Sequence, residues 1–193
     1  KLLDELAQVL GLSKPPRTIE SYDISNWGDG TSVCGMVTFR DGKPYKAGYR
    51  KFRMKTVLGT DDYASLAETV SRRAAEYEKY AALAAQGQGS DNYFGQKPDL
   101  LLMDEPYGQM DVKMRFYLED EVIRLWKELG STVIFITHNI EEAVYLAEKV
   151  MILTNKPAKI KEEVIIDLPR PRDITSPKFI EYRNYITDKI KWW

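Results

Sequence analysis

The segment "PDLLLMDEPYGQMD", residues 98–111, holds the side chains with the clearest capacity for chemistry. An apolar run ends here in Asp104 and Glu105, a pattern typical of a Walker B strand. In nucleotide hydrolases such a strand carries a magnesium-binding carboxylate and a catalytic glutamate. The motif acts only together with a loop that holds the nucleotide phosphates.

The sequence contains no such phosphate-binding loop. No G-x-x-x-x-G-K-[ST] pattern occurs, and the only Gly-Lys pair, Gly42-Lys43, precedes Pro44 in a segment that predicts a hairpin turn. The ATPase signature LSGGQ is also absent. Because Asp104 and Glu105 then have no nucleotide to act on, we expect neither ATP binding nor ATP hydrolysis.

Length and composition indicate a soluble globular protein. A chain of 193 residues suits one medium domain, and its net charge of -1 gives no global basic field that would attract nucleic acid. Cys34 is the only cysteine, which excludes an internal disulfide and a cysteine-rich metal site. No apolar run approaches the ~20 residues of a membrane span. We therefore expect a cytoplasmic protein without membrane insertion, and the oligomeric state stays open.

The first half predicts a short helix, an antiparallel meander and a long helix. Apolar residues recur at helical spacing over residues 2–10. Strand-like runs follow at 18–24, 32–40 and 44–54, and Asp41-Gly42 is a hairpin signal between the last two. Thr60 or Asp61 can cap the long helix that comes next.

From Leu100 onward strands and helices alternate. "LLLMD" and "VIFIT" are short apolar runs of the kind that buried parallel strands require, and the helix between them ends at Gly130. A helix, a strand "KVMILT" and a strand "KIKEEVIIDL" that pairs with it follow, before a last helix that starts at Ser176 and Pro177. The predicted fold is a single α/β domain with a mixed central sheet and helices on both faces.

Two resemblances account for these two patterns. The stretches "GLSKPPRTIESYDISNWGDGTSVCGMVTFRDGKPYKAGYRKFRMKT", "DDYASLAETVSRR" and "KPDLLLMD" resemble the RNase H-like endonuclease domain of UvrC, the nuclease subunit of bacterial nucleotide excision repair. The stretches "LLMDEPYGQMD", "LEDEVIRLWKELGSTVIFITHNIEEAVYLAEKVMILTNKPAKI" and "DLPRPRDITSPKF" resemble the back half of an ABC-transporter ATPase of the nitrate, sulfonate and taurine import type.

The two resemblances overlap on one strand. In the nuclease that strand runs into "DGG" followed by "GQ", and in the ATPase it runs into "DEP" followed by an "LD" loop; here "MDEPYGQMD" combines both. We interpret the chain as an engineered or recombined chimera within one domain. Residues 1–104 form its nuclease-like fragment, and residues 105–193 form its ATPase-like fragment.

The nuclease resemblance implies a divalent metal site. RNase H-like nucleases hold magnesium or manganese between carboxylates, and motif matching places these at Asp23 in "YDIS", Asp62 in "TDDYA" and Asp104 in "LLMD". Glu105 is a further carboxylate nearby. The family completes this site with a histidine in an "H-R-F" stretch, which is replaced here. His138, the only histidine, instead matches the switch histidine of the ABC family.

Some of these residues also have a purely structural interpretation. Asp61 or Asp62 can simply cap its helix, and His138 can be an inherited loop residue at a strand end. Lys51, Arg53 and Lys55 share one face of their strand, with Arg50 on the other, and this basic stretch is typical of a solvated strand face.

The sequence supports three hypotheses about function, in decreasing order of preference. The first is a recombined or designed scaffold with no complete inherited active site. The second is a residual metal-dependent DNA endonuclease that uses Asp23, Asp62 and Asp104, with DNA as its partner. The third is an ATP-binding module of an ABC importer. For the architecture, we expect "LLLMD" beside the first strand, "VIFIT" as a parallel fifth strand and "KVMIL" as the sixth strand of the same sheet.

Overall fold

A computed structural model describes residues 1–193 apart from 28–30, 54–61, 89–91, 106–111 and 192–193. The described chain forms two compact units, Lys1–Ile136 and Thr137–Trp193. The predicted fragment junction at residue 104 therefore lies inside the first unit. Each unit has its own sheet.

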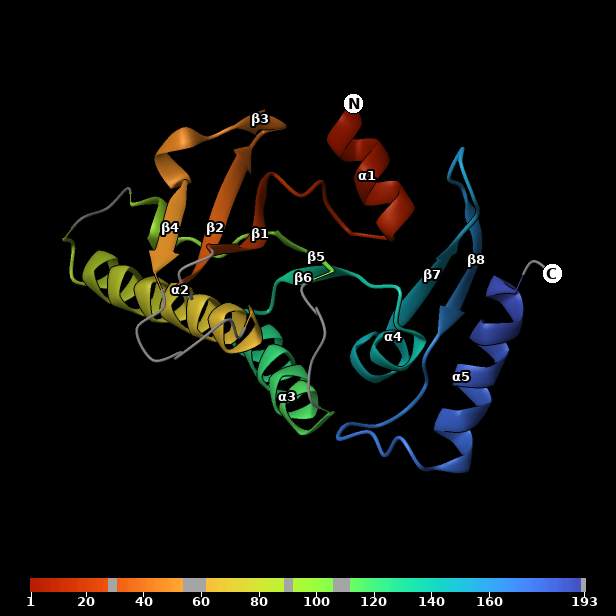
Figure 1. The fold of residues 1–193 in the computed structure, drawn as a ribbon. Coiled ribbons are helices and arrows are strands. Elements are labelled where there is room, and N and C mark those ends of the chain that lie inside the picture. Colours follow the sequence, from red (N-terminus) through yellow and green to blue (C-terminus); the bar gives the residue numbers. More distant parts are fainter. Residues whose placement is uncertain (28–30, 54–61, 89–91, 106–111, 192–193) are drawn as a thin grey trace. The chain divides into compact units, whose positions relative to one another are not determined.

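The sheet of the first unit is mixed, as expected. Its order is β3-β2-β1-β5-β6, with β4 also paired to β2 (Figure 1). The strands are β1 (Thr18–Trp27), β2 (Thr31–Arg40), β3 (Lys43–Pro44), β4 (Arg50–Arg53), β5 (Leu100–Asp104) and β6 (Thr132–Ile136). β1 pairs antiparallel with β2, while β1–β5 and β5–β6 are parallel. The expected places of "LLLMD" and "VIFIT" are thus confirmed.

The predicted hairpin joins β2 and β3. Arg40 and Lys43 are register partners, and the two residues between them have positive φ, 53° at Asp41 and 76° at Gly42. Positive φ at both positions defines the two-residue turn that matches strand twist. The predicted strand 44–54 is wrong in one respect, because η1 (Lys46–Gly48) interrupts it. There Gly48 lies so close to Thr38 that a Cβ atom would come within 2.9 Å of the Thr38 hydroxyl.

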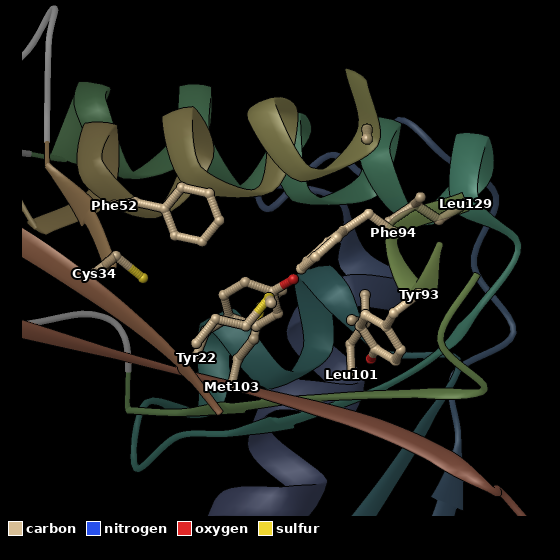
Figure 2. Close-up of a cluster of buried hydrophobic side chains, with 10 residues drawn as sticks. Tyr22, Cys34, Phe52, Tyr93, Phe94, Leu101, Met103 and Leu129 are labelled. Carbon is tan, nitrogen blue, oxygen red and sulfur yellow. The ribbon is translucent and has the colours of Figure 1, made fainter. Parts of the chain in front are cut away.

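Helices cover the sheet and bury a core. The first unit contains α1 (Leu2–Leu10), α2 (Asp62–Ala85), η2 (Tyr93–Gly95) and α3 (Val112–Leu129), and α2 packs against α3, β1 and β2. Figure 2 shows Tyr22, Leu101 and Met103 extending from the strands toward a helix, where they meet Phe52 and Phe94. Gly130, with φ of 62°, ends α3 as predicted.

The second unit contains α4 (Ile140–Leu146), β7 (Lys149–Leu153), β8 (Ile160–Ile165) and α5 (Pro177–Ile190). β7 and β8 pair antiparallel, as predicted. Buried side chains come from all four elements and include Val144, Val150, Val164, Phe179 and Ile186. Ser176 caps α5 by accepting a hydrogen bond from the Phe179 N–H, which confirms the predicted start of this helix.

The prediction that "KVMIL" forms a sixth strand of the main sheet is wrong. This segment is β7, and it belongs to a separate two-stranded sheet. β7 instead pairs with its antiparallel neighbour β8 and packs against α5, and Val150 and Ile152 of β7 are buried.

Candidate metal centre

Asp23 and Asp104 lie on neighbouring strands at matching positions. Tyr22 on β1 is the register partner of Met103 on β5, and each aspartate follows its partner residue directly. Tyr22 and Met103 are buried in the core on the α2 side of the sheet. Because successive side chains alternate between faces, Asp23 and Asp104 both extend from the opposite face, on strands about 4.8 Å apart.

This opposite face is open to solvent along one row of residues. Register pairs join Lys51 to Gly35, Gly35 to Asp23, and Asp104 to Ile136. Asp23 and Asp104 each directly follow the last register pair of β1 and β5, Tyr22–Met103. Lys51, Asp23, Asp104 and Ile136 are exposed, and Gly35 has no side chain. The two carboxylates are therefore accessible from solvent, which a metal ion and a large substrate both require.

Glu105 ends β5 in an unusual backbone conformation. Its φ is 37°, in the left-handed region that disfavours residues with a Cβ atom. Its backbone N–H donates a hydrogen bond to Ile136 O, so the turn is fixed against β6. The UvrC-like motif has glycine at this position, and the ATPase-like motif has glutamate. The backbone thus has the conformation that suits the first motif, while the side chain comes from the second.

Asp62, the third predicted metal ligand, and His138, a candidate catalytic residue, are the remaining candidate site residues. Asp62 is the first residue of α2, and its side chain lies outside the described residues, as do the proposed caps Thr60 and Asp61. His138 is exposed and belongs to the second unit, directly before Asn139, which caps α4. Within the described part of the chain, no three His, Cys, Asp or Glu side chains gather closely enough to hold a metal ion.

A buried ion pair that the sequence did not predict joins β1 to α2. Glu20, fully buried on β1, accepts hydrogen bonds from Arg73 of α2 at 3.1 and 3.0 Å. Tyr22 and Tyr93 also donate to this carboxylate, at 2.7 and 2.9 Å. Arg73 further donates to the carbonyl oxygens of Phe94 and Gln96. The signal available in the sequence was a glutamate on the face of β1 that alternation assigns to the core.

The buried Cys34 thiol, near Asp23, has a raised pKa. Burial raises the pKa of the Cys34 thiol to about 11; a hydrogen bond with Thr69 opposes this shift, and the nearby Asp23 carboxylate adds to it. Cys34 pairs with Ile24, the residue after Asp23, and lies on the core face. A buried thiol with a raised pKa is inert at neutral pH, so Cys34 is a core residue.

Comparison with known families identifies the family to which the chain belongs. The family model of the UvrC RNase H endonuclease domain matches residues 7–161. The chain belongs to this family. The range matched by the UvrC RNase H endonuclease domain includes β1, β5, Asp23 and Asp104.

Relatives of two kinds are found over different segments of this UvrC-family chain. The UvrABC system protein C of Dehalococcoides mccartyi is 38% identical over 159 residues, 81% of this chain and 24% of the relative. An uncharacterized ABC transporter ATP-binding protein of Methanocaldococcus jannaschii is 47% identical over 94 residues, 49% of this chain and 35% of the relative.

The aliphatic sulfonates import ATP-binding protein SsuB of Bacillus licheniformis is 41% identical over 95 residues, 49% of this chain and 37% of the relative. The chain thus spans about a quarter of the UvrC relative and about a third of the ABC relatives. Similarity to both groups is consistent with a combination of the two. Among the described helices, none has both the length and the apolar character that a membrane crossing needs.

Proposed function

We propose that this chain is a recombined nuclease domain that cleaves DNA with a divalent metal ion held by Asp23 and Asp104. The observation that carries the proposal is the register of β1 and β5, in which Tyr22 pairs with Met103 and each is directly followed by an exposed aspartate. Membership of the UvrC RNase H endonuclease domain family supports the reaction type.

The donor set suits a hard cation. Mg²⁺ prefers oxygen ligands, and in phosphoryl-transfer sites it is often held by one or two protein carboxylates and by substrate phosphate oxygens. Such an ion polarises the phosphodiester and lowers the pKa of a bound water. Asp23 and Asp104 would hold that ion from strands inside a hydrogen-bonded sheet, where the backbone sets the spacing of the two residues. Asp62 is proposed as a third ligand at the start of α2, and Glu105 as a neighbouring carboxylate.

The recombined origin is supported by the strand at which the two resemblances overlap. β5 ends the nuclease-like fragment and β6 lies in the ATPase-like fragment, yet the two pair in register over five residue pairs from Leu100–Thr132 to Asp104–Ile136. A shared sheet lets both fragments bury their apolar strands without a new interface. Glu105, directly after β5, has a left-handed backbone conformation, and this also supports a junction of the two fragments at this point.

The test is nicking of supercoiled plasmid DNA by the full chain in manganese, in magnesium and in chelator. We expect nicking with either metal and none in chelator. Asp23→Asn and Asp104→Asn should abolish nicking, whereas Asp167→Asn, an exposed aspartate after β8, should leave it unchanged. If the wild-type chain shows no metal-dependent nicking, it is an inert scaffold.

A further inference from the structure

β4 directs two neighbouring cations to opposite faces of the sheet. The Arg50 guanidinium lies over the Phe94 ring, 3.9 Å from its centroid, and donates to the carbonyl oxygens of Ala47 and Tyr49. Arg50 is thus engaged in packing on the α2 side. Lys51, the next residue, extends from the open face that carries Asp23 and Asp104.

Gly35 separates Lys51 from Asp23 in the same row. It pairs with Lys51 on one side and with Asp23 on the other. A Cβ atom added to Gly35 would meet only the Asp23 carbonyl oxygen, at an ordinary contact distance of 3.8 Å. Its φ lies outside the left-handed region. The fold therefore does not require glycine here, although glycine weakens a strand interior and often marks a place where a ligand or another backbone approaches closely.

We propose that Lys51 and Gly35 form a track for the phosphate backbone of a DNA strand, leading to the Asp23–Asp104 pair. The strand crosses the sheet over the bare surface at Gly35, and the Lys51 ammonium neutralises one of its phosphates. Placement of the cut at Asp23 and Asp104 rests on the proposed function; the binding role of Lys51 does not.

Spacing and charge fit this track. Lys51 and Asp23 lie two strands apart, which is about 10 Å. At this separation Lys51 reaches a phosphate that is close along the strand to the one at the carboxylates. The carboxylates repel a phosphate in the absence of metal, so a cation at the side of the pair is needed to hold the strand in place. The net charge of -1 makes such a local cation more important.

The experiment measures binding and cleavage separately. Binding of a fluorescein-labelled single-stranded DNA oligonucleotide is followed by anisotropy in chelator and in calcium, over a series of salt concentrations. Nicking of plasmid DNA in manganese is measured on the same proteins. The variants are Lys51→Ala, Gly35→Val and the matched control Lys43→Ala, which removes an exposed lysine from β3 at the far end of β2.

We expect Lys51→Ala to weaken binding several-fold and to reduce the slope of log K against log salt by about 0.7, the value for one lost contact to a single-stranded phosphate. Gly35→Val should weaken binding without lowering the melting temperature, because valine favours strands and has room there. Lys43→Ala should behave as the wild type.

The outcomes separate the two proposals. Binding that depends on Lys51 without any nicking retains the track and overturns the nuclease. Nicking that depends on Asp23 but is equal in Lys51→Ala and Lys43→Ala retains the nuclease and overturns the track. Absence of DNA binding by the wild-type chain in both buffers also overturns the track.

Discussion

Asp23 and Asp104 are adjacent across the parallel β1–β5 pair, because Tyr22 and Met103, the residues directly before them, are register partners. Both carboxylates are exposed on the face of the sheet opposite α2. Two like charges in this position repel each other, and a divalent cation relieves the repulsion.

Replacing Asp104 with asparagine should therefore raise the free energy of unfolding in chelator, by up to about 1 kcal/mol for a like-charged cross-strand pair. Thermal melts with chelator and with millimolar manganese provide the measurement. The wild-type chain should melt higher in manganese, the Asp104→Asn variant should not, and Asp167→Asn should respond as the wild type. Identical wild-type melts in the two buffers would show that the pair is not a working metal site.

Replacing Glu105 with glycine should stabilise the fold by about 0.5–1 kcal/mol. Glycine adopts the observed φ of 37° without a Cβ clash, and part of this gain is offset by the greater freedom of glycine in the unfolded chain. Urea unfolding measures the change. Glu105→Ala is the matched control, because alanine removes the carboxylate but keeps the Cβ atom; a gain as large in Glu105→Ala would contradict the conformational explanation.

Breaking the buried pair of Glu20 and Arg73 should be strongly destabilising. Arg73→Leu leaves the fully buried Glu20 carboxylate without its cation, at a cost of about 3–5 kcal/mol. The double variant Glu20→Leu with Arg73→Leu removes both charges and should unfold at a higher urea concentration than Arg73→Leu alone. Should the double variant be the less stable of the two, the uncompensated charge is not the cause.

Asp99 should contribute to the loss of stability in acid. Burial alone would raise the pKa of Asp99, but hydrogen bonds from the Thr18 N–H and hydroxyl and the nearby Lys14 ammonium lower it overall, below its ordinary 3.8. A lowered folded-state pKa stabilises the fold above pH 3.8, and this contribution is lost as pH falls through the folded-state value. Asp99→Ala should reduce stability at pH 7 and show a shallower decline between pH 5 and the acid limit, measured by urea unfolding across pH. A parallel curve for wild type and variant would refute this role.

ATP with magnesium should leave the melting temperature unchanged. A ligand at 100 times its dissociation constant would add about 2.7 kcal/mol to the free energy of unfolding, and the sequence has no loop of backbone N–H groups to hold the phosphates. Thermal melts with and without millimolar ATP-magnesium measure this, with ADP-magnesium alongside. A clear rise with ATP would overturn the expectation.

The sequence by itself determined the local elements and the family. Apolar periodicity, the Asp41-Gly42 turn, the Gly130 end of α3 and the Ser176 cap of α5 are all set by residues near one another in the chain, so pattern alone located them. The motifs around Asp23 and Asp104 identified the nuclease-like fragment for the same reason.

Only the tertiary structure decided how distant residues meet. The registers of β4 with β2 and of β2 with β1, which align Lys51, Gly35 and Asp23 on one open face, depend on hydrogen bonds between different strands. The burial of Glu20 against Arg73 likewise depends on how α2 packs on the sheet. β7 pairs with β8, the next strand in the chain, and packs against α5, where its apolar residues Val150 and Ile152 are buried. Strand propensity alone does not reveal which partner a strand pairs with.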